Sequence, residues 1–169
     1  MLGNSIESPL GSTTRENLEN VLNGISGLHL VGDNRLSDEP FYGGLIQGIE
    51  ITNSTKFEVL CRRVIEQLVQ KVRCDPDRTI FILSTTKGNI AFLEEGQKSN
   101  PRLHLHETAA YLAGIFGFKK HLVISNACIS GVMALLIGKR MIENEKYDYA
   151  LVVGADELSR FVISGFQSL

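Results

Sequence analysis

The most constraining feature of this sequence is the alternation between apolar runs of strand length and segments with helical periodicity. The run 79–84 (TIFILS) is rich in β-branched and aromatic residues, which is typical of a strand covered on both faces. The runs 121–125 and 149–155 have the same character, and a segment of helix length precedes each of them. Strands that alternate with helices indicate a largely parallel sheet covered by helices. The sequence therefore predicts an α/β fold.

Two capping boxes predict where helices begin. Thr13 is followed three residues later by Glu16, and Thr55 by Glu58. Behind the second box, apolar residues recur with the spacing of one helix face; they are Phe57, Leu60, Cys61, Val64, Ile65, Leu68, Val69 and Val72. This stripe places Cys61 in the core, where a free cysteine behaves as a small apolar residue. A further helix is expected over 105–116, with Gly117 as its stop.

Length and composition exclude several classes of protein. A chain of 169 residues is the size of one domain, and its net charge of -2 argues against nucleic-acid binding. No apolar run reaches the ~18 residues of a spanning helix, and no secretory segment follows Met1, so a cytoplasmic location is expected. The three cysteines form no CxxC pair, which argues against a disulfide framework and a zinc site.

Cys128 is the candidate nucleophile. It follows the strand 121–125 and a short polar turn, and it precedes a helix that runs to about Glu143. Unpaired N–H groups and the positive end of the helix dipole meet at a helix N-terminus, and both favour a thiolate. The same N–H groups can stabilise the oxyanion that forms when a thiolate attacks an acyl carbonyl. Because residues 129–138 are apolar around the whole helix, this helix is expected to be buried on all sides.

Three segments together resemble one enzyme family. The sequence 126–131 (NACISG) resembles the nucleophile motif of β-ketoacyl-acyl carrier protein synthases. The opening 8–11 (SPLG) with 23–28 (NGISGL), and the segment 148–156 that ends in VGAD, resemble other parts of these enzymes in the same order. The resemblance covers essentially the whole chain. It implies a thiolase-like fold, with a largely parallel mixed sheet covered by helices in α/β/α layers.

The resemblance also implies how the chain is organised. Residues 1–169 would form the N-terminal half domain, with Met1–Gly3 on the first strand, and the C-terminal half would lie outside this chain. The catalytic His or Asn residues and the ion-paired Lys and Glu of the family belong to that second half. The chain alone is therefore expected to be catalytically incomplete. Its tail 161–169 stays apolar to the last residue, so apolar surface meant for the second half is expected to be open.

The implied activity is that of an elongating condensing enzyme, an acyltransferase. Cys128 would take an acyl chain as a thioester for decarboxylative Claisen condensation in fatty-acid or polyketide biosynthesis. The implied partner is an acyl carrier protein with its phosphopantetheine arm, and neither a cofactor nor a metal is implied. Related synthases dimerise through the strand before the nucleophile, here 121–125, so a homodimer is expected.

Other readings stay open or are set aside. In the synthases that this chain resembles, the turn after the strand 79–84 is commonly glycine-rich and has an apolar residue where this sequence has Lys87. The resemblance implies that Lys87 either alters the acyl pocket or is a solvated loop lysine. His104 and His106 lack the further ligands of a metal site, and His121 is disfavoured as the base for Cys128. The alternative function is a non-catalytic ketosynthase-like protein that dimerises or scaffolds a complex.

Overall fold

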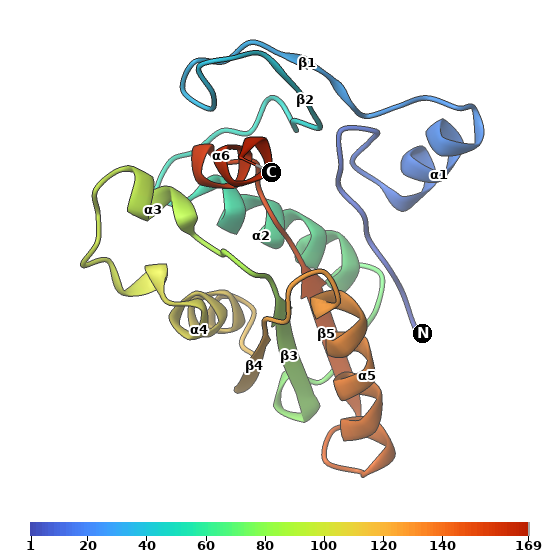
Figure 1. The fold of residues 1–169 in the computed structure, drawn as a ribbon. Coiled ribbons are helices and arrows are strands. Elements are labelled where there is room, and N and C mark those ends of the chain that lie inside the picture. The colour runs from blue at the N-terminus through green and yellow to red at the C-terminus, as the bar shows by residue number, and fades with distance from the viewer. Residues whose placement is uncertain (169) are drawn as a thin grey trace.

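The fold is built on a parallel sheet of three strands (Figure 1). The computed structural model describes residues 1–168. The strands, in the spatial order β4-β3-β5, are β3 (Thr79–Ser84), β4 (Lys120–Ile124) and β5 (Tyr149–Gly154). Ile82 on the central strand lies opposite Leu122 of β4 and Val152 of β5. The prediction of a helix-covered parallel sheet is confirmed, and the arrangement is consistent with a thiolase-like fold.

Helices cover both faces of the sheet, which gives three layers. They are α2 (Lys56–Val69) and α4 (Leu105–Ile115) on one face and α5 (Ser130–Glu143) on the other. The strand β3 is buried along its whole length, and its side chains alternate between the two layers. Phe81 and Leu83 pack with α2 and α4, while Ile80 and Ile82 pack with α5.

The predicted helix starts are confirmed. Thr13 caps α1 (Thr14–Leu22) and Thr55 caps α2, and each forms the full reciprocal box with the glutamate three residues on. Cys61 has no exposed surface and lies in the core between α2 and the sheet, as the apolar stripe predicts.

The remaining elements lie around this core. A short antiparallel pair and the helix α1 are set apart from the sheet (Figure 1). The elements not yet given are β1 (His29–Val31), β2 (Phe41–Gly43), η1 (Pro76–Arg78), α3 (Ile90–Glu94), η2 (Pro101–Leu103) and α6 (Arg160–Gln167). The helix α6 takes up most of the apolar tail, whose final residue, Leu169, is outside the described residues.

The expectation that the helix after Cys128 is buried on all sides is wrong. Only one face of α5 contacts the sheet, through Ala134 and Gly138. Ile129, Val132 and Leu135 are each more than half exposed. The apolar residues on the outer face have no layer to pack against within residues 1–168.

The chain start also differs from the expectation. Met1–Gly3 form no strand; Gly3 lies against Leu68 of α2 and against Val72, which follows that helix. Among the helices within residues 1–168, none combines the length and the apolar character that crossing a bilayer requires.

Candidate active site

Cys128 lies at the carboxyl edge of the parallel sheet. It comes four residues after the end of β4 at Ile124 and two residues before the first residue of α5. The carboxyl ends of β3 and β5, at Ser84 and Gly154, face the same hollow as Cys128. In open α/β sheets this edge is where ligands bind. The fold therefore presents the predicted nucleophile where a substrate can reach it.

The turn that carries Cys128 is held in an uncommon backbone conformation. Ala127 has a φ of 44°, in the left-handed region that non-glycine residues rarely adopt. The buried Ser130 hydroxyl closes the turn: it accepts from the Asn126 N–H at 2.8 Å and donates to the Ala127 carbonyl at 2.7 Å. Strained backbone held by its surroundings is found most often at functional sites.

The first turn of α5 supplies N–H groups beside Cys128. The Ile129 N–H donates to the Asn126 carbonyl, and the Ser130 N–H donates to the Ala127 carbonyl. The next two, of Gly131 and Val132, form no backbone hydrogen bond within residues 1–168. Such groups can stabilise negative charge on a ligand at a helix N-terminus.

Small and polar residues line the hollow around Cys128. It has a volume of about 320 Å³, and no side chain on it is larger than those of threonine and aspartate; the lining residues are Ser84, Thr85, Ala127, Cys128, Ser130, Gly131, Gly154, Ala155 and Asp156. The Thr85 hydroxyl lies 3.3 Å from Oδ1 of Asp156, to which it can donate. The small side chains leave room for a carbonyl group to approach the sulfur.

The other two cysteines are placed differently. Cys61 is fully buried, and burial, with the nearby charge of Glu58, raises the pKa of its thiol. Cys74 is half-buried and packs against the same core cluster. Of the three thiols, Cys128 alone is exposed.

The histidines lie away from the hollow. The rings of His104 and His106 stack 5.8 Å apart at the start of α4, and His121 lies on β4 opposite Phe81. Within residues 1–168, no group of three or more potential metal-binding side chains is found. Lys87 also does not line the hollow; its ammonium donates to the Thr86 hydroxyl at 2.7 Å.

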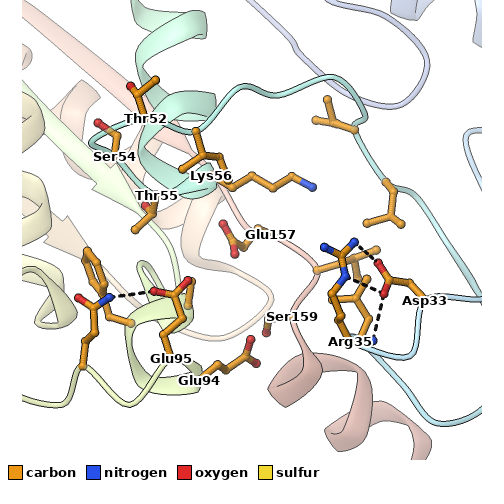
Figure 2. Close-up of a pocket in the computed structure, with 18 of the residues that line it drawn as sticks. Asp33, Arg35, Thr52, Ser54, Thr55, Lys56, Glu94, Glu95, Glu157 and Ser159 are labelled. Carbon is orange, nitrogen blue, oxygen red and sulfur yellow. Dashed lines mark hydrogen bonds and ion pairs between the residues drawn. The ribbon is translucent and has the colours of Figure 1, made fainter.

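A larger hollow lies elsewhere, and no cysteine lines it. It has a volume of about 860 Å³ and lies between the start of α2, α3 and the loop before α2 (Figure 2). Glu157 projects into it near Lys56, and burial raises the pKa of this carboxyl group. Asp33 and Arg35 form an ion pair of 2.7 Å at its other side. Sequence patterns did not indicate this hollow, because its lining comes from segments that are far apart in the chain.

Comparison with known proteins supports one family resemblance. Residues 123–163, about a quarter of the chain, match the family model described as 3-oxoacyl-[acyl-carrier-protein (ACP)] synthase III. The matched segment runs from β4 through Cys128, α5 and β5 into α6. The segment is thus similar to the condensing enzymes of fatty-acid synthesis. The match does not indicate that the chain belongs to the elongating type. A search of curated proteins found no match.

Proposed function

We propose that this chain is the N-terminal half of a β-ketoacyl-acyl carrier protein synthase in which Cys128 is the acyl-accepting nucleophile. One observation carries the proposal: the segment that matches a condensing-enzyme family is the segment that presents an exposed cysteine at the carboxyl edge of the sheet. The hollow and the start of α5 provide the space and the N–H groups that acyl transfer needs.

The proposed step is a transfer between two thioesters. The Cys128 sulfur attacks the carbonyl carbon of an acyl group on a phosphopantetheine thiol, and the carbonyl oxygen becomes an oxyanion near the Gly131 and Val132 N–H groups. The intermediate collapses with cleavage of the old carbon–sulfur bond. The acyl group is then bound to Cys128, and the proton from its thiol leaves on the pantetheine sulfur. Covalent catalysis of this kind divides one difficult transfer into two easier steps.

The subsequent condensation needs further groups. The joining of a decarboxylated malonyl unit to the acyl group requires donors for the developing negative charge. No histidine lines the hollow that Cys128 shares with Ser84 and Asp156. We therefore assign these donors to a C-terminal half outside residues 1–169. The full enzyme is proposed to work with an acyl carrier protein and to pair through the edge strand β4 as a homodimer.

Intact-mass measurement tests the acyl transfer. We expect the chain, incubated with an acyl carrier protein charged with a medium-length acyl group, to gain the mass of one acyl group that hydroxylamine removes. Cys128→Ser should abolish this gain while leaving the fold intact, because the change is nearly isosteric. Cys74→Ser is the matched control and should retain it.

The choice of acyl donor tests the finer assignment. An elongating enzyme should take the acyl group faster from the carrier protein, whereas faster transfer from acetyl coenzyme A would favour an initiating enzyme. The absence of any acyl mass at Cys128, in the presence of a folded chain, would contradict the proposal and favour an interaction role.

A further inference from the structure

A network of hydrogen bonds around the buried Glu58 joins the start of α2 to the turn that follows β3. Glu58 has no exposed surface, yet its carboxylate is fully paired. Its Oε2 accepts from Arg102 at 2.8 Å and from the Thr55 N–H at 3.1 Å, and its Oε1 accepts from the Asn89 amide at 2.8 Å. The network joins the start of α2 to residues that come 31 and 44 positions later in the chain.

Asn89 is the centre of this network. It is fully buried, and its amide nitrogen lies 2.8 Å from Glu58, 3.0 Å from the Arg102 carbonyl and 3.2 Å from the Thr108 hydroxyl. Its amide oxygen accepts a hydrogen bond from the Thr55 hydroxyl. Every polar atom of this side chain is thus occupied, which fixes the side chain in one orientation.

Such a network is a costly way to gain stability. The Glu58 carboxylate is removed from water, while the Arg102 side chain keeps 27% of its surface exposed. Well-packed apolar residues often serve stability as well as such a pair does. Arg102 is further held between two rings, with its guanidinium carbon 4.6 Å from the centre of Tyr111 and 5.3 Å from that of Phe92. What the network provides is a fixed position for the backbone on either side of Asn89.

That backbone leads directly to the hollow. Asn89 ends the turn that follows β3, and the turn begins at Thr85, which lines the hollow with Cys128. The Thr85 hydroxyl accepts from the Gly88 N–H at 3.1 Å, so the start of the turn is joined to the residue that precedes Asn89. The same hydroxyl can donate to Asp156, at 3.3 Å, which lies on the hollow as well.

We propose that Asn89, fixed by Glu58 and Arg102, is a positioning residue that sets the wall of the Cys128 hollow through Thr85 and Asp156. The inference rests on the proposed function of Cys128 as an acyl acceptor. Asn89 does not line the hollow, so its effect is transmitted through the turn between Thr85 and Asn89.

Two readouts on Cys128 test the proposal. The first readout is a rate ratio: the rate of acyl transfer to Cys128 divided by the rate at which iodoacetamide alkylates Cys128. Alkylation serves as the reference because it needs only an accessible thiol. The second is the ¹³C resonance of a methylthio label on Cys128, measured in the Cys74→Ser background. Asn89→Ala and Thr85→Val should lower the rate ratio about fivefold to tenfold, the effect expected of one lost hydrogen bond. Both should also move the resonance.

Matched variants separate positioning from general stability. Thr79→Val removes a buried hydroxyl at the opposite end of β3, where Thr79 donates to the Asp75 carbonyl at 2.6 Å. It should change neither readout, and Thr85→Ser, which keeps the hydroxyl, should restore both to the parent values.

The outcomes distinguish this proposal from the proposed function. If Thr85→Val leaves both readouts at the parent values, the positioning role is overturned. If Asn89→Ala fails to fold, the Thr85→Val variant alone still tests the proposal. If the parent chain transfers no acyl group, the proposed function fails, and the label resonance alone decides the positioning role. An equal response of Thr79→Val and Thr85→Val would show a general loss of stability and would overturn the proposal.

Discussion

At the scale of single residues, the position of Cys128 is set by its neighbours Ala127 and Ser130. Ala127 supplies a left-handed backbone step, and the Ser130 hydroxyl holds the turn closed across it. This arrangement directs the chain from the end of β4 into the start of α5 within a few residues. The exposed position of the sulfur follows from that turn.

The left-handed conformation at Ala127 leads to a prediction for its substitution. Ala127→Val should lower the free energy of unfolding by about 1–3 kcal/mol, because a β-branched side chain clashes with the backbone at positive φ. Ala127→Gly should change stability by less than about 1 kcal/mol, since relief of strain and loss of chain entropy oppose each other. Urea denaturation followed by circular dichroism measures both. Equal stability of the valine variant and the parent would contradict the prediction.

At the scale of elements, the packing of α5 on the sheet depends on a close approach at Gly138. A Cβ atom there would lie 3.0 Å from Cβ of Ala150 and 3.4 Å from Cδ1 of Ile82. Both neighbours belong to the sheet that the helix covers, so little space is available for a side chain. The approach lets the middle of α5 contact β3 and β5 together.

This contact predicts a large effect of a side chain at Gly138. Gly138→Leu should lower the free energy of unfolding by about 1–3 kcal/mol, the range measured for overpacked cores. The matched control is Gly114→Leu in α4, where a Cβ would meet no atom within 4 Å. That control should be neutral or slightly stabilising, because leucine favours a helix more than glycine does. Similar thermal unfolding of the two variants would refute the tight contact.

At the scale of the whole molecule, the open outer face of α5 is the feature with the largest consequence. Apolar surface is exposed at the N-cap residue Ile129 and, within α5, at Val132, Leu135, Leu136 and Ile142. Exposed apolar side chains gathered on one element often mark a place where another surface packs. We propose that the C-terminal half to which the catalytic donors were assigned stacks on this face.

The open face predicts self-association of the 169-residue chain. We expect the chain to bind a dye that senses apolar surface and to form species larger than a monomer in light scattering. Leu135→Lys should weaken both effects, because it places a charge in the middle of the face. Leu22→Lys, the same change at an exposed leucine of α1, is the matched control and should weaken them less.

The same measurement bears on the proposed homodimer. A dimer that pairs through the edge strand β4 does not use the outer face of α5, so it should persist in the Leu135→Lys variant. A compact monomer that binds no dye would contradict the predicted association and the proposed pairing together.

The sequence alone determined the features that depend on local chemistry. Capping boxes at Thr13 and Thr55 located two helix starts, because the reciprocal hydrogen bonds of a box involve only residues three positions apart. The apolar run of β3 predicted a strand buried on both faces, and the pattern around Cys128 placed this residue between a strand and a helix. Cys61 was assigned to the core from helix periodicity alone.

The tertiary structure decided what depends on residues far apart in the chain. The same apolar pattern on α5 fits a helix covered on all sides or on one side, and only the number of surrounding layers distinguishes the two. Glu58 was predicted as a capping residue, but its burial and its ion pair follow from Arg102 and Asn89, which the fold brings to it. Such contacts join separate segments, so no local spacing encodes them, and they are satisfied only once the layers have packed.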